Sequence, residues 1–179
     1  MLAVSVMAIY VPKEYEVPLY LFHQGKNAEA YKLFGSHFAK KDGVSGVVFR
    51  VWAPKAADVS VVGDFNHWNR EESYMKKISD GGIWELFIPG LKKFDNYKYS
   101  IKTERGQIKL KADPYGYHME TRPNTASKVY DISGYNWKDS KWMGEKKTKD
   151  VYRSPMNISE VHLNSWFTKS YEEERFSYM

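Results

Sequence analysis

The sequence contains no cysteine and no apolar run long enough to cross a membrane. Without cysteine, the fold cannot be held by disulfide bonds and cannot bind a metal through thiolates, which suits a protein of a reducing compartment. The apolar residues 1–11 are far fewer than the roughly 20 that a membrane-spanning helix needs, and no basic residues of a secretory signal precede them. We therefore expect a cytoplasmic protein that has no membrane partner.

Charge of one sign is not concentrated anywhere along the chain either. The 27 Lys and Arg residues exceed the 22 Asp and Glu residues by a formal net charge of +5, and the lysines are spread out. The densest basic run, residues 138–149, is interrupted by Asp139, Trp142 and Glu145, which is more typical of a solvated connector than of a nucleic-acid surface. The five histidines show no metal-ligand spacing. We predict no nucleic-acid partner, no metal site and no cofactor.

Aromatic residues are abundant, at 16% of the chain, and apolar and mixed residues alternate over short stretches. Val47, Phe49 and Val51 form one such apolar row, as half-buried antiparallel strands require. The pattern predicts strands at residues 47–52, 58–63, 83–88, 97–102, 107–111 and 127–131, with Gly, Pro, Asn and Asp between them. Short strands with frequent turn signals predict a mainly β fold, an immunoglobulin-like antiparallel β-sandwich.

The chain is predicted to divide into a leader, the sandwich, a linker and a final segment, at residues 1–42, 43–132, 133–155 and 156–179. The leader is expected to hold a short helix at Asn27–Phe34 that ends at Gly35, because glycine is the usual residue just after a helix. In the final segment, residues 156–163 have the pattern of one more strand.

The second predicted strand ends in Gly-Asp-Phe-Asn-His-Trp, at residues 63–68. The large ring of Trp68 therefore follows short polar side chains, among them Asn66. An aromatic face flanked by hydrogen-bonding groups is what a protein needs to hold a sugar ring, since the apolar ring face carries the contact. The alternative is that Trp68 closes the end of the sandwich as part of its core.

Seven different short motifs follow one another along the chain, at residues 21–25, 48–54, 62–68, 82–85, 111–115, 122–127 and 160–163. In this order they resemble the N-terminal part of bacterial 1,4-α-glucan (glycogen) branching enzymes of glycoside hydrolase family 13. The first three are shared with other starch- and glycogen-acting relatives. Arg-Pro-Asn-Thr-Ala-Ser at 122–127 and Glu-Val-His-Leu at 160–163 are more particular to branching enzymes.

The resemblance implies that residues 43–131 form a carbohydrate-binding module of family 48 and that residues 160–163 belong to the first strand of a (β/α)8 barrel. Ser159 and Asn164 depart there from the family's usual Tyr and Gly. The family's catalytic carboxylates lie on later strands, and such a barrel needs about 200 residues or more. We therefore expect a non-catalytic glucan-binding module of a glycogen-biosynthesis enzyme, truncated before the catalytic residues and without branching activity alone.

The resemblance also implies which side chains contact an α-1,4-glucan such as glycogen or a maltooligosaccharide. Trp68 matches a ring that stacks on glucose, and Lys98 matches a lysine that hydrogen-bonds sugar hydroxyls. Thr125 and Ser127 match polar positions that complete such a site, and Asn66 lies beside Trp68 in the sequence. The alternatives are a solvated lysine at Lys98 and a turn or strand-entry role for the adjacent Asn124 and Thr125.

One feature of the resemblance predicts weak binding. Glycogen-sensing relatives carry a second tryptophan where this chain has Ile108, so a single ring would hold the sugar. We expect roughly millimolar affinity, about 4 kcal/mol. Two other functions stay open: a stand-alone docking module that partners a separate catalytic barrel, and a nucleic-acid module, which would bind with steep salt dependence.

Overall fold

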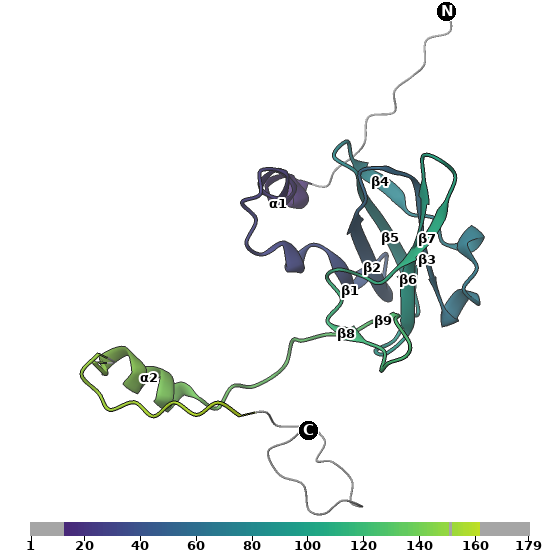
Figure 1. The fold of residues 1–179 in the computed structure, drawn as a ribbon. Helices are drawn as coiled ribbons and strands as arrows, with labels where there is room; N and C mark the ends of the chain where they lie inside the picture. Colours follow the sequence, from purple (N-terminus) through teal and green to yellow (C-terminus); the bar gives the residue numbers. More distant parts are fainter. Residues whose placement is uncertain (1–12, 151, 162–179) are drawn as a thin grey trace, which may run out of the picture. The chain divides into compact units, whose positions relative to one another are not determined.

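The computed structural model describes residues 13–150 and 152–161 (Figure 1). The chain divides into two compact units, Met1–Gly134 and Tyr135–Met179. No helix in the described part of the chain is long and apolar enough to cross a membrane.

Two antiparallel sheets make up the first unit (Figure 1). The first sheet contains, in order across it, β1 (Gly35–Lys41), β2 (Val44–Trp52), β5 (Ile83–Pro89) and β4 (Lys76–Ser79). The second contains β3 (Ala56–Gly63), β6 (Asn96–Thr103), β9 (Ser127–Lys128) and β8 (His118–Met119), while β7 (Ile108–Lys111) pairs with β6. The predicted mainly β fold, an antiparallel sandwich, is confirmed.

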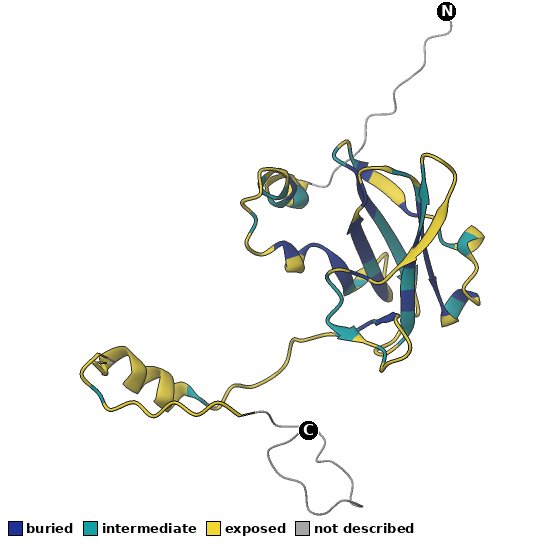
Figure 2. Ribbon diagram, viewed as in Figure 1, coloured by how far each residue is buried: buried dark blue, intermediate teal, exposed yellow. Residues whose placement is uncertain are grey.

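The core lies between the two sheets, and the central strands point alternate side chains into it. Val47, Phe49 and Val51 of β2 are buried, as the alternation predicted. Tyr97 and Tyr99 of β6 face them, and the rings of Phe49 and Tyr97 meet edge to face with centroids 4.9 Å apart. In Figure 2 the strands are accordingly darkest in the middle of the sandwich. The intervening residues of each strand therefore point to the outer faces, where Arg50 and Lys98 lie.

A second layer covers the outer face of the first sheet. It consists of the helix α1 (Lys13–His23) and the 3-10 turn η1 (Ala30–Lys32). A small apolar cluster joins this layer to the sheet and contains Leu19, Ala30, Leu33, Phe34, Ile78 and Ile83. Arg50 emerges from β2 beneath the layer, and its guanidinium donates to Glu85, to the Tyr15 hydroxyl and to the Leu33 carbonyl oxygen.

The predicted helix at Asn27–Phe34 is wrong, because this segment contains just the three-residue turn η1. The helix of this region is α1, which forms earlier although it contains Pro18. It ends in a Schellman motif: Gly25 has φ 67°, and Lys26 N and Gly25 N donate to the carbonyls of Leu21 and Phe22. Apolar residues at one face of α1 pack on the sheet, and this burial outweighs the weak helical pattern.

Three strands have no counterpart among the predicted ones: the two-residue β8, and the longer strands β1 and β4. β1 is largely polar and pairs along its whole length with β2, so Gly35 begins a strand instead of ending a helix. The sheet thus extends N-terminal to residue 43. β4 is short and contains an irregular register against β5. Both are strands at a sheet edge, where side chains need not alternate in polarity.

The second unit contains the helix α2 (Ser140–Thr148), within the region predicted as a linker. None of its residues is buried, and the contacts along it are local: Lys141 lies 3.9 Å from Glu145, and Lys146 Nζ lies 4.9 Å from the centre of the Trp142 ring. Residues 152–161 form no strand, and residues 162–163 lie outside the described part. The barrel strand at 156–163 therefore stays a prediction.

Candidate functional site

Trp68 lies on a tight loop at the end of β3. The 3-10 turn η2 (Asp64–Asn66) follows the strand, and then His67 and Trp68 both adopt left-handed backbone conformations, with φ of 53° and 60°. The loop closes where Trp68 N donates to the Gly63 carbonyl at 2.9 Å. As a result the Trp68 ring is 39% exposed, and it does not belong to the buried core.

Asp64 holds the Trp68 ring in place and connects it to the neighbouring strand. The indole Nε1–H donates to Asp64 Oδ1 at 2.9 Å, and Asn96 Nδ2 on β6 donates to Asp64 Oδ2 at 2.8 Å. Gly63 permits this arrangement, because a Cβ there would collide with the Asn96 carbonyl oxygen and the Phe65 ring. A ring held at one edge by a carboxylate loses little entropy when a ligand stacks on its face.

We predict that Asp64→Ala lowers the free energy of unfolding by about 1–2 kcal/mol, because two hydrogen bonds to one carboxylate are lost. Urea unfolding measures the loss, and the NMR shift of the Trp68 indole N–H reports the broken bond. Asp64→Asn is the matched control, because its amide oxygen still accepts one of the two hydrogen bonds. Its loss in the free energy of unfolding should be about half that of Asp64→Ala. An unaltered indole shift in Asp64→Ala would show that the carboxylate does not hold the ring.

Lys98 and Thr125 meet on the outer face of the second sheet. Lys98 lies between the buried Tyr97 and Tyr99 on β6 and therefore points outward, opposite Val62 of β3. Its ammonium donates to Thr125 Oγ1 at 2.8 Å. The predicted outward orientation of Lys98 is thus confirmed, and two predicted site residues from distant parts of the sequence lie in contact.

Asn66 and Ser127 lie inside the protein, which differs from their predicted role. The Asn66 side chain, 3% exposed, accepts from Gly63 N and donates to the Val61 carbonyl. The Ser127 hydroxyl is fully buried and accepts from Asp113 N at 2.8 Å. Asn66 therefore supports the loop that carries Trp68, Ser127 begins β9 just after Thr125, and neither side chain is open to a ligand.

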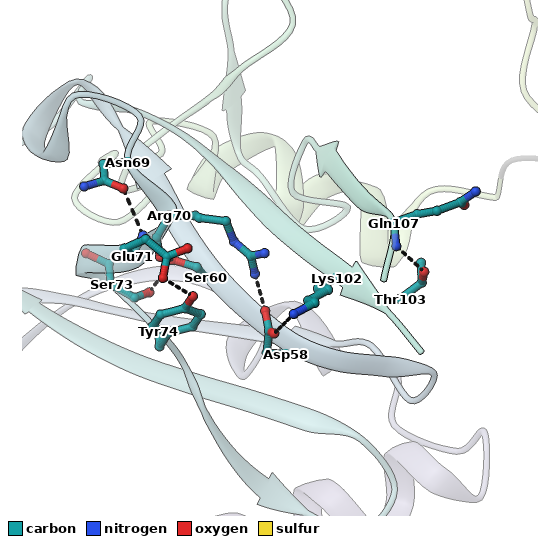
Figure 3. A network of polar contacts seen from close by, with 10 residues as sticks. All are labelled: Asp58, Ser60, Asn69, Arg70, Glu71, Ser73, Tyr74, Lys102, Thr103 and Gln107. Atoms are coloured by element: carbon teal, nitrogen blue, oxygen red, sulfur yellow. Dashed lines mark hydrogen bonds and ion pairs between the residues drawn. The ribbon is translucent and has the colours of Figure 1, made fainter. Parts of the chain in front are cut away.

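The segment after Trp68 folds back along β3, where Val61 N donates to the Ser73 carbonyl and Met75 N to the Val59 carbonyl. Figure 3 shows side chains of this segment beside Asp58 and Ser60. Its turn η3 (Arg70–Glu72) is fixed by an ion pair between Arg70 and Asp58. The Ser60 hydroxyl lies 2.6 Å from the Arg70 carbonyl oxygen. Outward polar residues of β3 thus anchor the loop at its far end, while Asp64 anchors it at Trp68.

Asp64, Asn96 and Asp58 were missed among the candidate residues. Asp64 stands within the motif at residues 62–68, so its position next to an aromatic ring was visible. Asn96 begins β6, and its pairing with Asp64 depends on strand order, which a single sequence does not reveal. In the described part of the chain, no group of His, Asp and Glu side chains has the arrangement of a metal site.

Comparison with known proteins finds a family model that matches part of the chain and relatives that match most of it. Residues 33–116 match the family model of carbohydrate-binding module 48, the isoamylase N-terminal domain. The 1,4-alpha-glucan branching enzyme GlgB of Bacillus subtilis (strain 168) is 49% identical over 172 residues, which are 96% of this chain and 27% of that enzyme. GlgB of Synechococcus sp. (strain JA-2-3B'a(2-13)) is 46% identical over 88% of this chain and 21% of its own.

Among solved structures, the pullulanase from Bacillus acidopullulyticus is 27% identical, with a TM-score of 0.43, over 55% of this chain and 12% of its own. The chain spans about a quarter of the length of the branching enzymes that it matches. The family match contains Trp68 and Lys98, and the longer alignment to the branching enzymes covers most of the chain. Residues 33–116 therefore belong to the carbohydrate-binding module 48 family, and the chain is homologous to the N-terminal portion of 1,4-alpha-glucan branching enzymes.

Proposed function

We propose that the chain binds α-1,4-glucan, such as glycogen or a maltooligosaccharide, on the exposed face of Trp68. The observation that carries the proposal is the held and half-exposed Trp68 ring within a carbohydrate-binding module 48 domain. Sugar rings have apolar faces that pack on aromatic rings, and they need few other contacts to be oriented. The names of the branching enzymes that resemble this chain point to α-glucan as the sugar polymer.

Lys98 and Thr125 are the polar partners that we propose for the sugar hydroxyls. They share one hydrogen bond, which Lys98 Nζ donates to Thr125 Oγ1, and the Lys98 ammonium has two further N–H groups with which it can donate. The Thr125 hydroxyl, which accepts from Lys98, can itself donate to a sugar oxygen. Ile108, 55% exposed, offers an aliphatic surface in place of a second ring, and this supports affinity in the millimolar range, about 4 kcal/mol.

In a branching enzyme, such a module would hold the glucan near a catalytic barrel that cuts and rejoins it. We propose that the barrel is the partner of this chain, either in the same polypeptide or as a separate one. The sandwich and its covering layer, through Gly134, would form the binding module, and residues 156–179 would lead toward the barrel.

We predict that the chain is retarded in a native gel that contains glycogen and that Trp68→Ala abolishes the retardation. Loss of the stacking ring should raise the dissociation constant by at least about tenfold, because roughly 1.4 kcal/mol or more of contact energy is removed. The mobility in glycogen relative to that in a plain gel measures the effect.

Trp137→Ala is the matched control, because Trp137 is 74% exposed and belongs to the second unit. This variant should be retarded like the unaltered protein. Equal mobility of the unaltered protein with and without glycogen would refute glucan binding, and retention of binding in Trp68→Ala would remove Trp68 from the site.

A further inference from the structure

Three aromatic rings from distant parts of the sequence meet at the start of β6. Phe94 belongs to the turn before β6, His118 to β8, and Tyr130 follows β9. Ring centroids are 5.5 Å apart for Phe94 and His118, 5.5 Å for Phe94 and Tyr130, and 5.2 Å for His118 and Tyr130. We call these three residues the Phe94 cluster.

The backbone of Phe94 is strained in a way that a core residue seldom is. Its φ of 77° lies in the left-handed region, which favours glycine and is costly for a bulky side chain. The side chain is nevertheless 51% exposed, so burial does not repay the strain in full. The backbone is held by a hydrogen bond from Phe94 N to the Val129 carbonyl at 2.8 Å. A strained residue that presents a large apolar ring to solvent is a candidate for ligand contact.

The other members of the cluster orient the Phe94 ring. Lys93 Nζ lies 4.0 Å from the centre of the Tyr130 ring and 5.4 Å from that of Phe94. This cation–π contact engages Tyr130, and the edge-to-face contact with His118, at 85° between the rings, supports Phe94 from the side. Phe94 is thus the most exposed ring of a cluster whose other members pack against it.

The cluster is continuous with the Trp68 site through the pairing of the second sheet. Asp64 accepts hydrogen bonds from the side chains of Trp68 and Asn96. Asn96 is paired with Lys128 on β9, and Lys128 is paired in turn with His118 on β8. Directly paired residues of antiparallel strands share a face of the sheet, so these side chains follow one row. Neighbouring strands are about 4.8 Å apart, which places the His118 backbone about 10 Å from that of Asn96.

We propose that the Phe94 cluster is a second sugar-binding surface, which contacts a remote unit of a glucan chain whose other end lies on Trp68. The inference rests on the proposed function and extends it: the module would prefer an oligosaccharide of several glucose units to a di- or trisaccharide. The exposed Phe94 ring supplies the apolar contact. Lys128, which is paired with Asn96 on one side and with His118 on the other, has donors for the hydroxyls of the intervening units.

The test compares maltotriose with maltoheptaose by NMR titration of the full chain and of Phe94→Gly. Glycine adopts the left-handed conformation without strain, so this variant should stay folded, which circular dichroism and thermal unfolding check. We expect its dissociation constant for maltoheptaose to rise roughly 3- to 10-fold, as for the loss of one aromatic contact, and that for maltotriose to stay the same. Phe94→Tyr keeps the ring and should bind both sugars like the unaltered chain.

The possible results separate this inference from the proposed function. If Trp68→Ala weakens binding of both sugars while Phe94→Gly weakens neither, glucan binding stands and the second surface is refuted. If Phe94→Gly weakens both sugars equally, the ring belongs to the first subsite and the length preference is refuted. If the unaltered chain binds neither sugar, both the proposed function and this inference are overturned.

Discussion

Replacement of Asp113 by alanine is expected to lower the free energy of unfolding by about 3–5 kcal/mol, because two buried tyrosine hydroxyls lose an acceptor at roughly 1–3 kcal/mol each. Asp113 is 1% exposed, and its Oδ2 accepts from the hydroxyls of Tyr97 and Tyr99 at 2.7 and 3.0 Å. Alanine would leave both hydroxyls buried without this acceptor. Urea unfolding followed by tryptophan fluorescence measures the loss.

The same carboxyl group should make stability depend on pH. Burial raises the pKa of Asp113 above its usual 3.8, while hydrogen bonds from Tyr97, Tyr115 and Tyr99 oppose part of the rise. Because the folded state binds this proton more tightly, the stabilisation that comes from this tighter proton binding is fully present below the unfolded-state pKa of Asp113. It is lost as the pH rises through the higher folded-state pKa. Burial also raises the pKa values of Tyr97 and Tyr99, which keeps their hydroxyls as donors.

Asp113→Asn is the control for both effects. Its amide oxygen still accepts a hydrogen bond, so we expect a smaller loss, about 1–2 kcal/mol, at the pH where the alanine variant is measured. It has no proton to release, so the stability of the unaltered protein relative to Asp113→Asn should fall as the pH rises above 3.8. A difference that is constant with pH would show that the pKa of Asp113 does not change on folding.

Arg50→Ala is expected to cost about 3 kcal/mol, the lower end of the range for breaking a buried ion pair, because Glu85 stays partly accessible. The Arg50 side chain is 7% exposed and that of Glu85 27% exposed, with 2.6 Å between Arg50 Nε and Glu85 Oε2. The guanidinium also lies over the Tyr15 ring, 4.2 Å from its centre, and donates to the Tyr15 hydroxyl at 2.7 Å. Its loss should therefore loosen α1 as well as destabilise the sandwich.

Urea unfolding and limited proteolysis near α1 measure these two effects of Arg50. The double variant Arg50→Met/Glu85→Leu should recover much of the stability, because apolar side chains of similar volume often replace a buried ion pair without loss. Tyr15→Phe, which removes one hydroxyl, should cost about 1 kcal/mol. If Arg50→Ala unfolds at the same urea concentration as the unaltered protein and α1 resists protease equally, Arg50 does not join the layer to the sheet.

The strands with alternating polarity were predictable because half of their residues face the core. β2, β3, β5 and β6 all belong to this class, and their inward rows are buried or partly buried. β1, β4 and the helix α1 were not predictable in this way. β1 is a polar edge strand, and α1 contains Pro18 and is stabilised by burial against the outer face of the first sheet.

The candidate site was predictable in part. The ring of Trp68 and the outward Lys98 follow from the local pattern and the resemblance, and both have exposed or half-exposed positions. The burial of Asn66 and Ser127 depends on which backbone groups surround them, so their short polar side chains gave no sign of it. Asp113 begins a turn, as its place before Pro114 indicates, and its Oδ1 accepts from Tyr115 N. That its Oδ2 also accepts from two core tyrosines is a tertiary contact that its sequence position did not reveal.

Local sequence patterns were enough to identify the family, the two-sheet architecture and the ring at the end of β3, because motifs and alternation are local properties of a chain. The tertiary structure alone decided which polar side chains meet, because strand order brings Asn96 to Asp64 and Lys98 to Thr125. It also brought Phe94, His118 and Tyr130 together from three separate segments. Contacts between strands distant in sequence depend on topology and register, which no local pattern specifies.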